Sequence, residues 1–311
     1  MTHERCTPLI EQQHGNVCYL QFNHYRQFPG LIHGVFTRTG GYSQAPYQGL
    51  NTFIPEEGEG DSIDNVVRNR MLVLQALGQA EAPAVSLIAE HCADVIIFDP
   101  RDEWYTDWAS YEYEEHMRSP SANLKYKGDA LITQQRGTAL VLSFADCVPI
   151  LLYDSAREVI GIAHGGWRGS ARGMAVATVE AMAEHFGSEP QHIYAGIGPA
   201  IGACCYEVSE TVRQIFQGEL SFDDKPTSER YQNIVRESAV FSTQVLPDKT
   251  SLRLDLQEIN RNQLLMAKVP PEQIEVMRIC TGCNTDRFFS HRRENSNTGR
   301  FPVIIALAAD Q

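Results

Sequence analysis

One stretch of the chain carries the strand pattern from which we predict the fold. It reads Ala139-Leu-Val-Leu-Ser-Phe-Ala-Asp-Cys-Val-Pro-Ile-Leu-Leu-Tyr-Asp154, and it continues after a short turn as Val159-Ile-Gly-Ile-Ala-His-Gly-Gly-Trp-Arg-Gly169. Short apolar runs bounded by turn residues are typical of buried strands. We therefore predict strands at 139–144, 149–154 and 159–163. A glycine-rich loop at 165–169 follows them, and then an amphipathic helix to about Phe186.

Strand and helix patterns interleave on both sides of this stretch. Upstream, the pattern predicts strands at 17–22, 32–37 and 84–97, the last interrupted at Glu90-His91, and a helix from Ser62 to about Leu77 with Val66, Val67, Met71, Leu74 and Leu77 on one face. Downstream, it predicts strands at 193–197, 274–279 and 303–308, and helices at 207–217 and 255–268, the latter capped by Asp255. No strict βαβ rhythm appears, so we expect an α+β fold with mixed sheets rather than a doubly wound Rossmann fold.

The composition narrows the classes of function. The 311 residues carry a formal net charge of −13, which argues against nucleic-acid or membrane partners because both attract basic surfaces. No apolar run reaches the roughly 18 residues that a spanning helix requires, and the N-terminus shows no secretory signal. We expect a cytoplasmic protein whose partners are small-molecule substrates and whose eight cysteines are reduced or metal-bound.

Three metal-ligand side chains stand where predicted strands end. His91 ends an apolar strand, Cys147 directly follows one, and His164 stands where a strand meets Gly165-Gly166. Two histidines and one cysteine form a three-ligand set that leaves a fourth zinc position open for water. Their spacing matches no local zinc motif, so a buried thiol and two hydrogen-bonded histidines are an equal alternative from spacing alone.

Longer motifs surround these residues. They are Ser143-Phe-Ala-Asp-Cys-Val-Pro-Ile, Ala163-His-Gly-Gly-Trp-Arg-Gly, Gly196-Ile-Gly-Pro-Ala-Ile-Gly, His33-Gly-Val-Phe-Thr-Arg-Thr-Gly-Gly-Tyr-Ser, Phe289-Ser-His-Arg-Arg and Thr298-Gly-Arg. Together they resemble the laccase-domain family of YfiH-like proteins, first labelled multicopper polyphenol oxidases and later interpreted as purine nucleoside phosphorylases. The resemblance runs in order from about residue 17 to the end. It implies one domain over 1–311, with the first 16 or so residues outside the resemblance and an insertion at about 99–127.

The resemblance also implies a fold, a metal and an activity. The fold is a four-layer sandwich of mixed sheets with helices outside, and the zinc ligands are His91, Cys147 and His164. The implied reactions are phosphorolysis of adenosine, inosine, guanosine and methylthioadenosine, and deamination of adenosine. Zinc with an open position lowers the pKa of water toward neutrality, which suits attack on the purine C6 atom. Phosphorolysis needs cationic groups that hold phosphate while the sugar gains oxocarbenium character.

Several further residues are candidates for this chemistry. Arg38, in the glycine-rich loop, is our first choice for holding phosphate, and Arg168 and Arg292 are second choices that are equally explained as structural ion pairs. Asp146 is a candidate general acid or base beside Cys147, or a group that orients a ligand. Asp129 is a candidate partner of a zinc histidine. His33 either borders the substrate pocket or is a core histidine, and His291 replaces a tyrosine that the family pattern expects.

Other functions stay open at this point. A copper-dependent polyphenol oxidase (laccase) needs many paired histidines, but the ten histidines never form His-x-His. A cysteine hydrolase would use Cys147 as nucleophile and His164 as base, and editing of peptidoglycan precursors is a related hydrolytic role. A non-catalytic interaction protein is the third class.

The remaining cysteine motifs predict no second metal site. Cys280-x-x-Cys283 is a lone pair without a partner pair at zinc-finger spacing. Cys204 and Cys205 are adjacent after a glycine-rich turn, and we interpret them as packed thiols.

Overall fold

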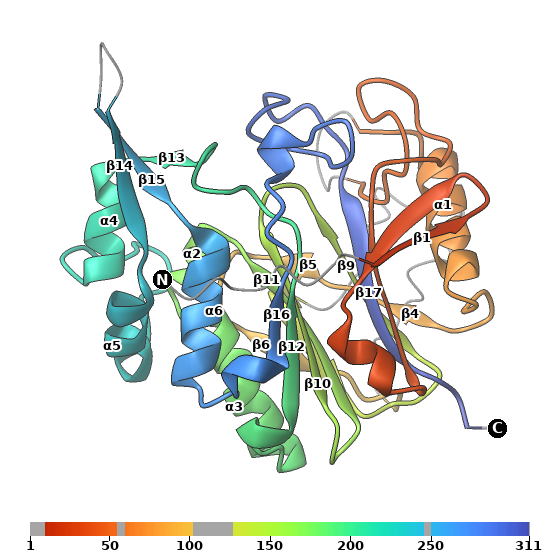
Figure 1. The fold of residues 1–311 in the computed structure, drawn as a ribbon, viewed down its shortest axis with the longest axis horizontal. Helices are drawn as coiled ribbons and strands as arrows, with labels where there is room; N and C mark the ends of the chain where they lie inside the picture. Colours follow the sequence, from red (N-terminus) through yellow and green to blue (C-terminus); the bar gives the residue numbers. More distant parts are fainter. Residues whose placement is uncertain (1–9, 55–59, 102–126, 246–249, 311) are drawn as a thin grey trace.

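The computed structural model describes residues 10–54, 60–101, 127–245 and 250–310, and two six-stranded sheets form its centre (Figure 1). The first sheet has the order β1 (Ile10–His14), β2 (Val17–Gln21), β3 (Leu31–Phe36), β17 (Phe301–Leu307), β9 (Ala139–Phe144), β4 (Ala84–Val85). The second has the order β16 (Ile274–Val276), β12 (Ile193–Ile197), β10 (Val148–Asp154), β11 (Val159–Gly165), β8 (Ala130–Thr133), β6 (Val95–Ile97). Both sheets are mixed, since β4 pairs parallel with β9, and β6 and β16 pair parallel with β8 and β12.

The central strands are apolar along their whole length because both of their faces are buried. In β17, Val303 and Ile305 pack into the core between the two sheets, whereas Ile304 and Ala306 pack on the opposite face. Strand β10 alternates in the same way between the core that contains Leu151 and the one that contains Ile150. Side chains of a strand alternate between its faces, so a strand covered on both sides needs apolar residues at every position.

Helices cover the outer face of each sheet. Helix α1 (Ile63–Ala76) packs on the first sheet through a core that it shares with β9 and β17. Helices α3 (Met174–Phe186) and α6 (Leu256–Met266) pack on the second sheet, on the opposite side of the molecule from α1 (Figure 1). The layers are therefore helix, sheet, sheet, helices, which confirms the expected mixed fold and its sandwich of sheets.

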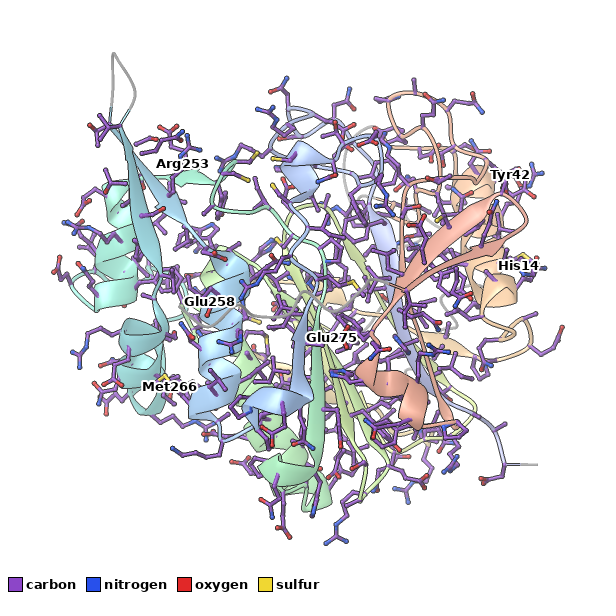
Figure 2. The ribbon with its side chains drawn as sticks, in the orientation of Figure 1. His14, Tyr42, Arg253, Glu258, Met266 and Glu275 are labelled. Atoms are coloured by element: carbon purple, nitrogen blue, oxygen red, sulfur yellow. The ribbon has the colours of Figure 1, made fainter. Side chains whose placement is uncertain are left out.

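Smaller elements extend this sandwich. Beside α6 stands a three-stranded sheet in the order β13, β15, β14, with α4 and α5 next to it (Figure 1). The bounds are α2 (Trp167–Ser170), α4 (Glu210–Gln217), α5 (Glu229–Ser238), β5 (Ile88–Ala89), β7 (Lys127–Gly128), β13 (Glu207–Val208), β14 (Phe241–Val245), β15 (Thr250–Leu254), η1 (His24–Gln27), η3 (Pro190–His192), η4 (Pro271–Gln273) and η5 (Thr281–Cys283). Glu275 on β16 (Figure 2) ties η1 to the second sheet, because its carboxylate accepts the backbone N–H groups of Asn23 and His24 at 3.0 and 2.9 Å. Within the described residues, no helix combines the length and the apolar character needed to span a bilayer.

Some predicted elements differ from the structure. The predicted face of α1 is wrong in part, because Met71 is 49% exposed while Asn69 and Arg70 are buried. Asn69 donates to the Asn51 carbonyl at 2.7 Å and Arg70 to the Thr52 carbonyl at 3.0 Å, so polar residues of this helix hold the adjoining loop. The predicted helix at 207–217 begins instead with β13, and α5, β14 and β15 were not predicted. The predicted insertion at 99–127 lies mostly outside the described residues, which resume at 127.

Candidate active site

Cys147 lies where the chain crosses from one sheet to the other. Strand β9 of the first sheet ends at Phe144, and β10 of the second begins at Val148. Asp146 within this short crossover has a φ of 85°, a left-handed conformation that most side chains avoid. Such strain is typical of functional sites, where the surrounding structure holds the backbone in place.

His164 reaches Cys147 through the register of the second sheet. Strands β10 and β11 pair antiparallel with Val148 opposite Gly165, one residue beyond Cys147 and His164. The His164 side chain is buried and its Nδ1 atom lies 2.7 Å from the Asp129 carboxylate. A neutral imidazole that donates Nδ1–H to a carboxylate keeps Nε2 free to bind a metal.

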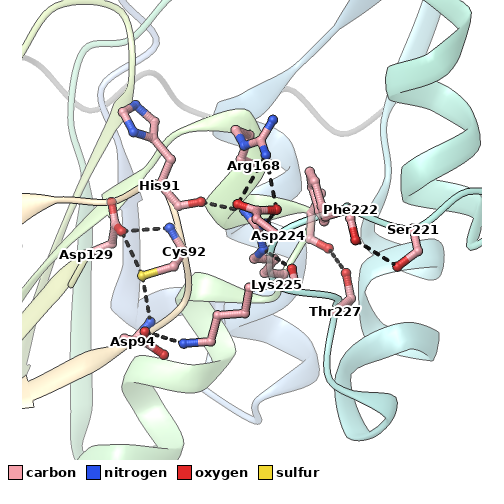
Figure 3. Close-up of polar contacts among 12 residues, drawn as sticks. His91, Cys92, Asp94, Asp129, Arg168, Ser221, Phe222, Asp224, Lys225 and Thr227 are labelled. Carbon is pink, nitrogen blue, oxygen red and sulfur yellow. Dashed lines mark hydrogen bonds and ion pairs between the residues drawn. The ribbon is translucent and has the colours of Figure 1, made fainter. Parts of the chain in front are cut away.

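His91 is the third member, in the loop between β5 and β6. Its φ is 56°, and its carbonyl accepts a 2.6 Å hydrogen bond from the buried Arg172 guanidinium. The next residue, Cys92, donates its backbone N–H to Asp129 at 2.7 Å (Figure 3). Asp129 therefore binds both the loop that carries His91 and the ring of His164.

The three side chains fit a metal ion. Their ligand atoms lie within 4.8 Å of one another, and the rings of His91 and His164 are 5.1 Å apart between centroids. Gly166 leaves the space beside them open, because a Cβ atom at this position would lie 3.2 Å from the Cys147 sulfur. Two imidazoles, one thiolate and a carboxylate behind one imidazole are the donor set of a three-ligand zinc site.

Electrostatics favour the thiolate. Burial raises the pKa of Cys147, but the nearby His164 and His91 outweigh burial and lower the pKa below the usual thiol value. Burial likewise lowers the pKa of His164, whereas Cys147 and Asp129 raise it above the usual imidazole value. Without metal, the pair is a thiolate beside an imidazolium.

A cavity of about 360 Å³ opens onto this cluster. Its aromatic and aliphatic wall includes Trp167, Ile201, Tyr206 and Leu256, and its polar wall includes Asp146, His291, Arg292 and Arg300. This is the size of a site for a small molecule.

Comparison with known proteins identifies the family. Residues 32–308 match the family described as multi-copper polyphenol oxidoreductase laccase. The chain belongs to this family. It is 34% identical over 280 residues to the purine nucleoside phosphorylase YlmD of Geobacillus stearothermophilus, covering 89% of this chain and 90% of that one. It is 31% identical over 281 residues to a purine nucleoside phosphorylase of Bacteroides thetaiotaomicron, covering 90% of this chain and 93% of that one.

Solved structures of laccase-domain relatives share the fold. The structure of YlmD from Geobacillus stearothermophilus superposes with a TM-score of 0.77 at 31% identity, covering 97% of this chain and all of that one. The YfiH protein of Bacillus licheniformis superposes with a TM-score of 0.76 at 31% identity, covering 96% of this chain and 98% of that one. These likenesses confirm the family resemblance seen in the motifs.

Two residues that we predicted at the substrate site lie elsewhere. Arg38 lines a separate surface pocket, and its guanidinium is already held by the Thr285 carbonyl at 2.8 Å and by Glu294 at 2.9 Å. His33 is buried in the first sheet, where its Nε2 accepts the Phe22 N–H at 2.9 Å. Neither residue lines the cavity beside His91, Cys147 and His164.

Of the other two predicted arginines, one lines the cavity and one does not. Arg168 points to Asp224 at 3.3 Å (Figure 3) and does not line the cavity. Arg292 does line it, with its side chain held by the Glu207 carbonyl at 2.9 Å and over the Tyr206 ring. Arg300, which we did not single out although it closes the motif Thr298-Gly-Arg, lines the cavity as well.

Arg172 was not predicted either, and no local signal marks it. It follows the motif Ala163-His-Gly-Gly-Trp-Arg-Gly by three residues, and its role depends on segments far away in sequence. Besides the His91 carbonyl, it donates to the Lys225 carbonyl at 2.8 Å and to Asp224 at 2.7 Å.

Proposed function

We propose that this protein is a zinc-dependent purine nucleoside phosphorylase that also deaminates adenosine. One observation supports it best: His91, Cys147 and His164 converge beside a cavity whose wall carries two arginines. Among the residues that the structure describes, no carboxylate forms an ion pair with Arg292 or Arg300, so both charges are available to an anion. The proposal covers adenosine, inosine, guanosine and methylthioadenosine, and assumes the reducing cytoplasm.

The donor set supports zinc over a multicopper centre. Of the three candidate metal-ligand groups within the described residues, only this one contains histidine. A multicopper oxidase needs several histidine-rich centres, and the sequence has no His-x-His pair. Zinc bound here would act as a Lewis acid and lower the pKa of water toward neutrality.

Phosphate fits the basic wall of the cavity. Burial lowers the pKa of the Arg300 guanidinium, which the Cys147 charge partly offsets, and arginine stays cationic at neutral pH. Its side chain stacks 3.7 Å from the Phe53 ring centroid, which fixes its direction. We assign the phosphate to Arg300 and Arg292, which replace Arg38 and Arg168 in this role.

The purine fits the aromatic and aliphatic wall. Trp167 offers a flat apolar face, Ile201 and Leu256 adjoin it, and Tyr206 links this wall to Arg292, which lies over its ring. Flat rings stack favourably on such faces. The nucleoside would then lie between this wall and the arginines, with its ring near the metal ligands.

Asp146 serves the site by positioning it. Its carboxylate accepts hydrogen bonds from the Thr281 hydroxyl at 2.6 Å, the Ser290 hydroxyl at 2.7 Å and the Arg292 backbone N–H at 2.7 Å. A carboxylate that accepts three hydrogen bonds is a strong anchor. We therefore propose that Asp146 holds Arg292 against the cavity and is not the general acid or base that we considered.

Chromatography of nucleosides incubated with the zinc-loaded enzyme tests the function. Free base that appears only when phosphate is present, together with ribose phosphate, supports phosphorolysis. Inosine formed from adenosine without phosphate supports deamination. If no purine nucleoside is converted under either condition, the proposed function is wrong.

A cysteine hydrolase is the second candidate. Cys147, His164 and Asp129 form a thiol, imidazole and carboxylate series, which is the arrangement of a thiol nucleophile with its base. The sulfur cannot serve as a zinc ligand and as a free nucleophile at once. Labelling of zinc-loaded protein with iodoacetamide separates the two: protection of Cys147 favours zinc, and rapid alkylation favours the hydrolase.

A further inference from the structure

Four cysteines from two distant segments meet outside the cluster of His91, Cys147 and His164. Cys204 and Cys205 follow β12, and Cys280 and Cys283 begin and end the turn that contains η5. Their four sulfur atoms lie within 4.8 Å of one another. The sequence spacing gave no hint of this, so our prediction of a lone Cys-x-x-Cys pair and two packed thiols needs correction.

We propose that Cys204, Cys205, Cys280 and Cys283 bind a second, structural zinc ion. Sulfurs at about 2.3 Å from a tetrahedral zinc lie about 3.8 Å from one another. The Cys283 sulfur lies 3.5 Å from that of Cys204 and 3.4 Å from that of Cys205. These distances are close to the zinc value and well above the roughly 2.05 Å of a disulfide bond.

The backbone holds the two segments in this arrangement. Ala200 and Cys280 form a parallel β-bridge, and the Thr281 N–H donates to the Ala200 carbonyl at 3.0 Å. The Gly202 N–H donates to the Cys280 sulfur at 3.2 Å. Hydrogen bonds from outer groups to ligating atoms are common around metal centres and stabilise the ligands.

Two glycines make room for the sulfurs. A Cβ atom at Gly202 would lie 3.2 Å from the Cys280 Cβ and in ordinary contact with the sulfurs of Cys204 and Cys280. A Cβ atom at Gly282 would lie 3.0 Å from the Cys205 Cβ and 3.2 Å from its sulfur. A side chain at either position would therefore crowd a cysteine of the cluster, most at Gly282.

The chemistry of the donors selects the ion. Four thiolates are a soft set that prefers zinc over hard cations such as magnesium and calcium. Closed four-cysteine sites are typical of structural zinc, whereas catalytic sites keep an open position. Cys204 and Cys283 are exposed, which leaves the ion a path of entry from solvent.

A zinc ion here would brace the wall of the cavity. On one segment, Ile201 and Tyr206 flank Cys204 and Cys205 and line the cavity; on the other, His291 and Arg292 follow Cys283. Joining the two segments fixes the separation between the aromatic wall and Arg292. We therefore expect loss of this ion to weaken substrate binding without emptying the first site.

Zinc stoichiometry, measured by mass spectrometry of purified and buffer-exchanged protein, tests the proposal. We expect two zinc ions per chain in the wild type, one in Cys147→Ser, one in Cys280→Ser/Cys283→Ser, and none in the combination. Cys18→Ser is the matched control, since this thiol lies on β2 beside Glu11, and it should keep two. If Cys280→Ser/Cys283→Ser keeps as much zinc as the wild type, or if iron replaces zinc, the proposal is wrong. If Cys147→Ser keeps two zinc ions while Cys280→Ser/Cys283→Ser loses one, the assignment of the first site is wrong and that of the second holds.

Thiol protection provides a test that needs no substitution in the cluster. Wild-type protein is treated with iodoacetamide with and without bound zinc, and the modified cysteines are identified by peptide mass spectrometry. We expect zinc to protect four cysteines together from alkylation: Cys204, Cys205, Cys280 and Cys283. Removal of zinc by a chelator should make all four reactive together. Alkylation of the exposed pair at equal rates in both states, or disulfides among the four, would overturn the assignment.

Discussion

Asp129 is the buried side chain that would support the proposed metal site. It is fully buried, binds the ring of His164 through one oxygen, and binds the Cys92 N–H and thiol through the other. Burial raises its pKa, but His164 and Cys92 outweigh burial and lower it. The carboxylate is therefore ionised and lends charge to the ligand histidine.

Asp129→Asn tests this support. The amide keeps the size of the side chain but removes its charge, so we expect zinc affinity at the first site to fall by about 10–100-fold. Competition with a chromophoric chelator measures it. The control is Asp154→Asn, a buried aspartate that accepts the backbone N–H groups of Ala156 and Arg157 in a remote turn. Equal affinity in both variants would remove Asp129 from the metal site.

Arg300 is the side chain that we expect to contribute most to phosphate binding. Arg300→Met should raise the KM for phosphate by about tenfold or more, because hydrogen bonds to a charged group contribute about 1.5–3 kcal/mol. Arg168→Met, which loses contacts to the exposed Asp224, should change it little. Steady-state kinetics with varied phosphate measures both. A large effect in Arg168→Met and none in Arg300→Met would instead favour Arg168, one of our second choices from the sequence.

At the scale of elements, the loop of His91 is held by a segment distant in sequence. Arg172, between α2 and α3, links the His91 carbonyl to Asp224 and to the Lys225 carbonyl. Lys225 also pairs with Asp94 on the far side of the same loop (Figure 3). The stretch before α5 therefore braces the left-handed backbone at His91.

Arg172→Lys should weaken zinc binding through this loop. Lysine keeps the charge but cannot reach three acceptors in the planar fork of arginine, so we expect about a tenfold loss of zinc affinity. Arg168→Lys is the control, because Arg168 pairs with the exposed Asp224 and lies over the Trp167 and Phe222 rings but does not contact the His91 loop. Thermal unfolding of the zinc-free proteins separates a local effect from general destabilisation. Unchanged affinity in Arg172→Lys would show that the loop holds its shape without this contact.

At the scale of the whole molecule, burial in the sandwich of sheets keeps two histidines, His24 and His33, neutral. Burial, together with the neighbouring His24, lowers the pKa of His33 to about 3. Burial also lowers the pKa of His24 to about 4. The unfolded chain therefore binds more protons than the folded chain below about pH 6.5.

Stability should consequently fall as the pH falls. Full stability is present above the unfolded pKa of 6.5, and it declines toward the folded pKa. For His33, the loss between pH 7.5 and pH 5 is about 2 kcal/mol. Urea unfolding at both values measures it in the wild type and in His33→Gln, where glutamine retains an acceptor for the Phe22 N–H but does not titrate. The pH dependence should shrink by about that amount in the variant; an unchanged difference would contradict the assignment.

The sandwich follows largely from local sequence pattern. The run 139–165 forms β9, β10 and β11 as predicted, because strands covered on both faces require apolar side chains at nearly every position, and this leaves a strong local signal. Sheets of this composition must be covered by helices. The weaker elements leave less signal: β14 is mostly exposed, and β15 has only two apolar residues among its five.

Local sequence patterns were therefore enough to predict the central strands and the family, and to single out His91, Cys147 and His164, whose ligand atoms the fold brings within 4.8 Å of one another. Only the tertiary structure decided which arginines face the cavity and which cysteines meet. Arg38 and Arg300 lie in equally suggestive motifs, but Glu294 and the Thr285 carbonyl already hold Arg38. Cys204 and Cys280 are brought together by the bridge between Ala200 and Cys280. Such pairings depend on contacts between residues far apart in the chain, which no local spacing encodes.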